Sequence, residues 1–108
     1  MRFFCVVIYK YTSTGNVDTI TRKYYKNLSN ALEYAKYVVN EYNSRRCPSG
    51  VYFYNEVNIT EESFLHKSKN SMGTKYCEVA QLLKNGKTSC RKEWIDIELI
   101  DIEDEIGV

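Results

Sequence analysis

Residues 3–9 read FFCVVIY and decide the fold, because every position in the run is apolar or aromatic. An apolar run without alternation is typical of a strand that is covered on both faces. The sequence therefore predicts a strand in the centre of a sheet. Gly15 and Asn16 then supply turn chemistry, and the Thr- and Tyr-rich residues 17–25 predict a second strand, so we expect a hairpin.

A long helix is predicted over about residues 29–44. Its apolar side chains recur at helical spacing and form one stripe: Leu28, Ala31, Leu32, Ala35, Val38, Val39 and Tyr42. Asn27 or Ser29 is the expected N-cap, and residues 47–50 (CPSG) end the helix. The helix thus has one face to pack against a sheet.

Three further strands are predicted after this helix. Residues 51–59 alternate, and we expect Val51, Phe53, Val57 and Ile59 to face the core. Thr60 and the two glutamates after it favour a short helix to about residue 67. Residues 76–84 and 87–102 flank Asn85-Gly86, a hairpin signal whose two-residue loop predicts these cross-strand pairs: Cys77–Trp94, Val79–Lys92, Gln81–Cys90, Leu83–Thr88 and an unfavourable Glu78–Glu93.

The predicted fold is a single α+β domain over residues 1–108, since 108 residues are too few for two ordinary domains. We expect one five-stranded, mainly antiparallel sheet in the order β-β-α-β-β-β, with the long helix on one face. The composition, 44% apolar and 27% charged, is typical of a packed globule. The start of the chain lacks the features of a signal peptide, so the expected location is the cytoplasm, or the host cytoplasm if the protein is viral.

Charge is divided unevenly along the chain. Residues 1–92 carry 15 basic and 7 acidic side chains, whereas residues 93–108 carry 7 acidic side chains and no basic one. Apolar residues alternate with acidic ones in residues 95–103 (IDIELIDIE), and the phase changes between Leu99 and Ile100, which predicts a bulge or a break there. Such asymmetry bears on the choice of partner more than the net charge of +1 does.

Three readings of this acidic strand are open. Its carboxylates could pair with the chain's own lysines and arginines, form an outward-facing ridge for a basic partner, or belong to a tail exchanged within a homodimer. We expect the ridge, with aromatic side chains as anchors, docking on a larger protein that has a basic surface. The predicted partner-binding residues are Trp94, Asp96, Glu98, Asp101, Glu103, Asp104, Glu105, Tyr34 and Tyr37.

The alternative is binding of single-stranded nucleic acid. Tyr52 and Tyr54 would stack on bases from the outer face of their strand, and basic side chains would contact phosphates. The predicted residues of this alternative are Tyr52, Tyr54, Arg45, Arg46, Lys67, Lys69 and Lys75. The small overall charge makes nucleic acid the less favoured partner, and no membrane partner is expected.

No catalytic, cofactor or metal site is predicted. The single histidine, His66, lies in an expected loop, and nothing in the sequence brings it to Cys47, a candidate loop thiol. The four cysteines lack zinc-ligand spacing. Carboxylates on a solvated strand would keep ordinary acidity and make poor general acids. The sequence therefore predicts a small non-enzymatic protein-binding module, of the kind that a virus or mobile element uses to inhibit a host system.

Overall fold

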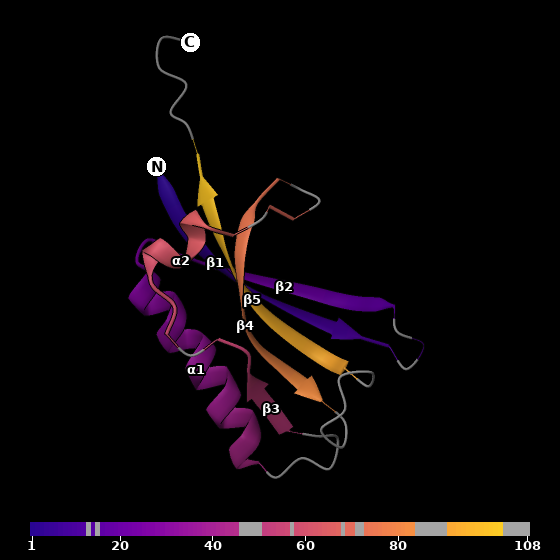
Figure 1. The fold of residues 1–108 in the computed structure, drawn as a ribbon. Helices are drawn as coiled ribbons and strands as arrows, with labels where there is room; N and C mark the ends of the chain where they lie inside the picture. The colour runs from indigo at the N-terminus through magenta and orange to yellow at the C-terminus, as the bar shows by residue number, and fades with distance from the viewer. Residues whose placement is uncertain are drawn as a thin grey trace.

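Five antiparallel strands form one sheet in the computed structural model (Figure 1). They are β1 (Arg2–Tyr11), β2 (Val17–Tyr25), β3 (Val51–Tyr54), β4 (Lys75–Leu83) and β5 (Arg91–Asp101), arranged in the order β2-β1-β5-β4-β3. The structure describes residues 1–12, 14, 16–45, 51–56, 58–67, 69–70, 73–83 and 91–102. The acidic strand β5 is therefore the middle strand of the sheet and not an edge.

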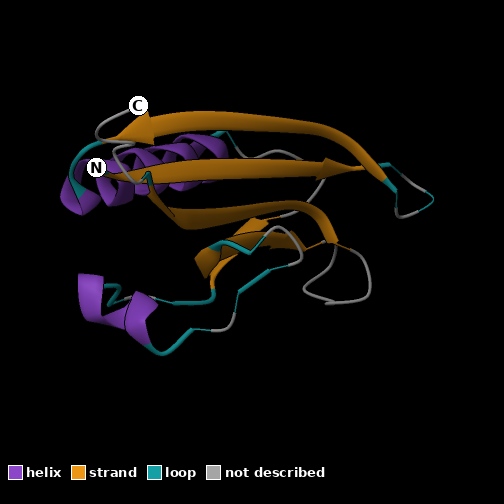
Figure 2. Cartoon of the chain, turned by 90° about the horizontal axis from the view of Figure 1, so that it is seen from above, coloured by secondary structure: helices purple, strands orange, loops and turns teal. Residues whose placement is uncertain are grey.

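Two helices pack on the same face of the sheet. The long helix α1 (Leu28–Ser44) buries the stripe Leu28, Ala31, Ala35 and Val39 against it. Figure 2 shows from above how the helices lie relative to the strands. The short helix α2 (Glu61–Leu65) inserts Phe64, whose ring centroid lies 5.7 Å from that of Phe4 on β1. The predicted α+β fold, with one long helix on a five-stranded sheet, is confirmed.

The N-cap residues predicted from the sequence are found at the starts of both helices. Thr60 is the N-cap of α2 and forms a capping box with Ser63, and Glu61 and Glu62 occupy the first turn, where negative charge suits the helix dipole. The N-cap of α1 is Asn27, although its side chain makes no capping hydrogen bond. No described helix has the length and apolar character needed to cross a membrane.

The predicted register of β4 against β5 is wrong. Cys77 lies opposite Ile97 and not Trp94, Gln81 lies opposite Trp94, and Glu78 faces Asp96 and not Glu93. Leu83 pairs with Arg91 and not with Thr88, so the register is not the one that a two-residue turn at Asn85-Gly86 would set. The predicted partners Thr88 and Cys90 lie outside the described residues.

The predicted break between Leu99 and Ile100 is also wrong. Pairing of β5 with β1 is continuous from Arg2–Asp101 to Lys10–Glu93. The register shifts lie instead on the other side of β5, including one between Glu78 and Ala80 of β4. Ile100 occupies the sheet face opposite to Leu99, so two consecutive apolar residues serve two faces without any bulge.

Strand β3 presents the opposite face to the one predicted. Tyr52 is 3% exposed and packs against Tyr42 of α1, whereas Val51 and Phe53 are each 48% exposed. The Tyr52 hydroxyl donates a hydrogen bond to Glu93, so this side chain satisfies its polar tip while its ring completes the core. Ile59 is buried as expected, and Val57 lies outside the described residues.

Replacing Phe64 by alanine tests how α2 is held. We expect Phe64→Ala to lower the free energy of unfolding by about 3–5 kcal/mol, because a fully buried aromatic ring is removed. The neighbouring Leu65→Ala removes an exposed side chain and should change stability by less than about 0.5 kcal/mol. Urea unfolding of both variants measures the difference, and equal losses would contradict this packing.

Candidate functional site

The sheet face opposite α1 and α2, the helix-free face, carries the side chains of chemical interest. Phe4, Val6, Ile95 and Ile97 belong to the core beneath the helices. Because successive side chains of a strand point to opposite faces, the intervening residues of β1 and β5 project from the helix-free face. The register places Val7 opposite Asp96 and Tyr9 opposite Trp94 on that face.

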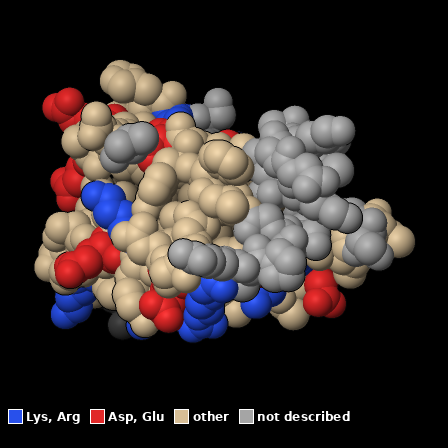
Figure 3. Space-filling view, turned by 90° about the horizontal axis from the view of Figure 1, so that it is seen from below, with Lys and Arg blue, Asp and Glu red and all other residues tan. Residues whose placement is uncertain are grey.

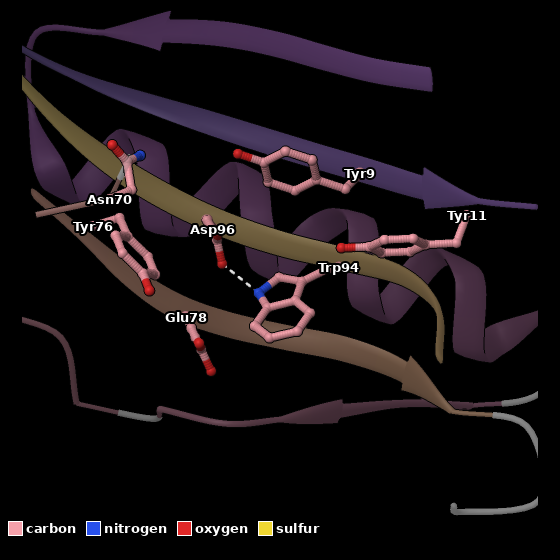
Figure 4. A pocket seen from close by; sticks show the side chains of 7 residues that line it. All are labelled: Tyr9, Tyr11, Asn70, Tyr76, Glu78, Trp94 and Asp96. Carbon is pink, nitrogen blue, oxygen red and sulfur yellow. Dashed lines mark hydrogen bonds between the residues drawn. The ribbon is translucent and has the colours of Figure 1, made fainter. Parts of the chain in front are cut away.

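A pocket of about 230 Å³ opens on this face (Figure 4), and we call it the β5 pocket. Aromatic rings and oxygen acceptors line it, and the lining residues are Tyr9, Tyr11, Asn70, Tyr76, Glu78, Trp94 and Asp96. Tyr9 and Tyr11 come from β1, Trp94 and Asp96 from β5, and Tyr76 and Glu78 from β4. Three adjacent strands thus build one site from residues far apart in sequence.

The bulge in β4 orients part of this lining. Val79 and Ala80 are consecutive residues that are both buried in the core, so regular alternation is broken between Glu78 and Gln81. The Val79 carbonyl accepts backbone N–H bonds from Asn55 at 2.9 Å and Glu56 at 3.5 Å. The bulge therefore leaves both Glu78 and Gln81 off the core side, next to β5.

Asn70 reaches the pocket from the turn before β4. Its Oδ1 accepts a hydrogen bond from the Thr74 backbone N–H at 3.0 Å, and its own N–H donates to the Thr74 carbonyl at 2.9 Å. Gly73 closes this turn at a φ of 78°, a left-handed conformation that glycine adopts without steric strain. The turn fixes Asn70 at the rim of the pocket.

Asp96 is the buried acid of the pocket, at 8% exposed. Its Oδ1 accepts a hydrogen bond from the Trp94 indole N–H, drawn as a dashed line in Figure 4, and its Oδ2 accepts none from the described residues. Burial raises the pKa of Asp96 to about 7; the Trp94 hydrogen bond opposes this rise, while Glu78, Glu98 and Glu56 add to it. The expectation of ordinary acidity along this strand is wrong for Asp96.

The phenol of Tyr9 is held neutral beside these carboxylates. Burial, together with the negative charges of Glu98 and Asp96, raises the pKa of Tyr9 to about 12. At physiological pH its hydroxyl is therefore protonated and able to donate or accept a hydrogen bond. Strand β1 therefore contributes no negative charge to the pocket, because it contains no Asp or Glu and its Tyr9 is neutral.

Other carboxylates of β5 are engaged by the chain's own residues. Glu98, which is 4% exposed, lies 3.1 Å from Arg22 Nη1, and Glu93 accepts from Tyr52 and lies 3.8 Å from Lys10. Asp101 lies 3.9 Å from Arg2. In the described part of the chain, Asp96 alone among these four residues has no Lys or Arg within ion-pair distance.

The prediction of an outward-facing acidic ridge is therefore wrong for Asp96 and Glu98. Both lie on the central strand of the sheet, where neighbouring strands and side chains cover them. Figure 3 shows acidic and basic side chains interspersed on the side seen from below. Glu103, Asp104 and Glu105 lie outside the described residues.

The two predicted helix anchors lie away from the β5 pocket. Tyr34 packs beneath Lys23, whose Nζ is 4.3 Å from the ring centroid, and Tyr37 is exposed on α1. Both line a separate groove of about 420 Å³ between α1 and the sheet. The structure thus brings Trp94 and Asp96 together but leaves Tyr34 and Tyr37 on the helix side.

Residues predicted for nucleic-acid binding do not converge either. Tyr52 lies under α1 and is not on an outer face, so that part of the prediction is wrong. Lys67 pairs with Glu56 at 2.8 Å, and Arg45 pairs with Glu41 at 3.1 Å. Lys75 begins β4, next to the bridging Lys69, whereas Tyr52 and Tyr54 pair near the other end of β4, and Arg46 lies outside the described residues.

Sequence reasoning missed most of the pocket lining. Tyr9 and Tyr11 on β1, and Tyr76 and Glu78 on β4, received no functional prediction. The alternation of Tyr9 and Tyr11 at the end of the apolar strand β1 could have indicated an aromatic surface on one face of the sheet. The residues of β4 and β5 that lie beside them depend on the strand order, which the sequence does not show. Within the described residues, no group of three or more His, Cys, Asp or Glu is placed to hold a metal ion.

Comparisons with family models, curated proteins and solved structures give no significant match.

Replacing Asp96 by asparagine should stabilise the protein at neutral and higher pH. The pKa of Asp96 is raised from about 3.9 in an unfolded chain to about 7, so its favourable contribution is complete below pH 4 and is lost as the pH rises to 7. Asparagine can still accept the Trp94 hydrogen bond and carries no charge. We expect Asp96→Asn to exceed the native protein in unfolding free energy by up to about 4 kcal/mol at pH 8, and by little at pH 4.

Urea unfolding between pH 4 and pH 8 measures this difference. Asp101→Asn is the matched control, because it removes an exposed carboxylate from the same strand and leaves Asp96 in place. A variant that is less stable than the native protein at pH 8 would contradict the unpaired state of Asp96. The other ionisable groups near Asp96 are common to both proteins and are Tyr9, Glu56, Lys67, Cys77, Glu78 and the Arg22–Glu98 pair.

Proposed function

We propose that this chain is a non-enzymatic protein-binding module whose helix-free face docks on a basic surface of a larger protein. A basic side chain of that partner enters the β5 pocket and pairs with Asp96. The observation that carries the proposal is that Asp96 is buried beside Trp94 without a cation from the described part of the chain. The pocket supplies the anion, and the partner supplies the missing charge.

The free energy of an unpaired buried carboxylate supports this role. Burial without a counter-ion disfavours the charged form, which is why the pKa of Asp96 is raised. A cation that enters the pocket offsets this penalty through its attraction to the carboxylate, while losing part of its own hydration. Exposed pairs on protein surfaces are worth only about 0–1 kcal/mol, so one cation bound at Asp96 can outweigh several rim contacts.

The lining is suited to a cation in a second respect. Four aromatic side chains lie around the carboxylates Glu78 and Asp96, and no Lys, Arg or His is among the described residues that line the pocket. A cation is attracted to the faces of Trp and Tyr rings, with an energy that grows when water is excluded. Aromatic faces and carboxylates therefore attract the same ligand, and no basic group of the lining competes for the site.

Neutralisation elsewhere on β5 makes Asp96 the focus of negative charge. Arg22 offsets Glu98 and Lys10 lies beside Glu93, which leaves the region around Asp96 and Glu78 with excess negative charge. The proposed contact is therefore still on the acidic strand, as predicted from the sequence. It lies in the β5 pocket and not along an exposed acidic edge. Trp94 is the expected aromatic anchor.

Phosphates fit this face less well than basic side chains do. Glu78 and Asp96 would repel a nucleic-acid backbone, and the buried Tyr52 cannot stack on a base. Acid–base catalysis is also less favoured, although a pKa near 7 would suit it, because the described lining residues include no histidine, serine, cysteine or lysine.

A reducing compartment such as the cytoplasm fits two side chains. Cys5 and Cys77 are free and fully buried, and burial raises the pKa of each thiol, to about 11 for Cys77. Inhibition of a host protein by a viral or mobile-element protein is one use of a surface that captures a basic side chain, and it stays a prediction from the sequence.

A binding assay with short peptides tests the proposal. Trp94 is the only tryptophan, so its fluorescence reports on the pocket. We expect a peptide containing both lysine and arginine to bind, more weakly as salt is raised, while an acidic peptide of equal length and a single-stranded oligonucleotide do not. Asp96→Asn should weaken binding of the basic peptide at least tenfold.

The matched control for this assay is Glu33→Gln, which removes one negative charge from the exposed face of α1. Its affinity for the basic peptide should stay within twofold of the native protein. Equal weakening by both variants would mean that net charge alone drives binding. Tighter binding of the oligonucleotide than of the basic peptide would refute the proposed partner.

A further inference from the structure

We infer that the β5 pocket is selective for the guanidinium group of an arginine side chain over the ammonium group of lysine. This inference rests on the proposed function and specifies which basic side chain the partner inserts. Three properties of the pocket carry it: an excess of hydrogen-bond acceptors, the spacing of its two carboxylates, and its flat aromatic walls.

Acceptors outnumber donors around the pocket. Asp96 Oδ2 accepts no hydrogen bond from the described residues, and Glu78 accepts only a 3.4 Å bond from the Asn55 side chain. Gln81, opposite Trp94 on β4, has a buried Oε1 without a partner in the described part of the chain. A ligand with many donors and no acceptor fits such a site, and guanidinium has five N–H donors against three for ammonium.

The two carboxylates are placed for a ligand that spans them. Glu78 and Asp96 are directly opposite each other on neighbouring antiparallel strands, so their Cα atoms are about 4.5–5.5 Å apart and both side chains project from one face. The planar fork of guanidinium can donate to two carboxylates at once. Ammonium is a compact point charge and would satisfy the pair less completely.

The walls of the pocket are flat rings from three strands. Figure 4 shows Tyr9 and Tyr11 on β1, Trp94 on β5 and Tyr76 on β4 around Asp96. Guanidinium stacks on aromatic faces and is more weakly hydrated than ammonium, so it loses less hydration on entering. Quaternary ammonium would use the rings but would leave the acceptors without donors, so it is not the favoured ligand.

The probes are three small molecules of similar length: N-acetyl-arginine amide, N-acetyl-lysine amide and N-acetyl-citrulline amide. Citrulline matches the shape of arginine but is neutral. The signal of the single indole N–H in a ¹⁵N-correlated NMR spectrum reports binding, because this group donates to Asp96. We expect arginine to shift the signal with at least fivefold higher affinity than lysine, and citrulline to cause no saturable shift.

Variants separate selectivity from charge. Glu78→Gln should reduce the affinity for the arginine probe more than that for the lysine probe, because it removes one of the two carboxylates that the fork spans. Asp96→Asn should abolish binding of both cations, and Glu33→Gln should change neither. Folding of each variant is checked by the dispersion of the same spectrum.

Two outcomes would overturn the inference and leave the proposed function standing. One is equal affinity for arginine and lysine, which would make the pocket a general cation site. The other is binding of basic peptides to the helix-free face without any shift of the indole signal by the arginine probe. If neither the probes nor the peptides bind, the proposed function fails as well.

Discussion

The central position of β5 in the sheet is the constraint on which the rest of the structure depends. Because β5 has neighbours on both edges and helices on one face, Asp96 and Glu98 project from the helix-free face, where adjacent side chains cover them, while Glu93 lies on the helix side beside Tyr52. Buried carboxylates need partners, because leaving water is unfavourable for a charge. Glu98 is paired with Arg22 and Glu93 accepts a hydrogen bond from Tyr52, whereas among the described side chains Asp96 accepts only from the indole N–H of Trp94. The incomplete pairing of Asp96 coincides with an aromatic pocket, and perturbed carboxylates in clefts are often functional.

Local sequence signals were sufficient for the elements of the fold. The apolar run of β1, the stripe of α1 and the cap of α2 each depend on residues close together in the chain, and each prediction was confirmed. Signals that depend on distant partners failed. The Asn85-Gly86 signal assumed the tightest possible loop, and the resulting register differs by three or four residues from the observed one. The prediction assigned the wrong face of β3 to the core, because Tyr52 is a core residue whose hydroxyl is hydrogen-bonded to Glu93.

The candidate site was predicted only in part for the same reason. The charge pattern of the acidic strand predicted Trp94 and Asp96 as binding residues, and both line the pocket. Their neighbours Tyr9, Tyr11, Tyr76 and Glu78 could not be identified, because the strand order that places β5 between β1 and β4 is not a local property. The bulge at Val79 and Ala80 likewise sets which β4 residues face the pocket, and only the pairing with β5 reveals it. Counting charges along the chain found the right strand but not whether its carboxylates were exposed or buried.

Direct titration of Asp96 tests the central claim that this buried carboxylate has no cation beside it within the described part of the chain. The ¹³C chemical shift of its carboxyl carbon, followed by NMR from pH 3 to pH 9, gives the pKa without reference to stability or to any ligand. We expect a midpoint near 7 for the native protein, as burial beside Glu78 and Glu98 requires. A midpoint near 4, the value of an ordinary solvated or ion-paired aspartate, would contradict the claim and remove the reason to expect a basic partner at this pocket.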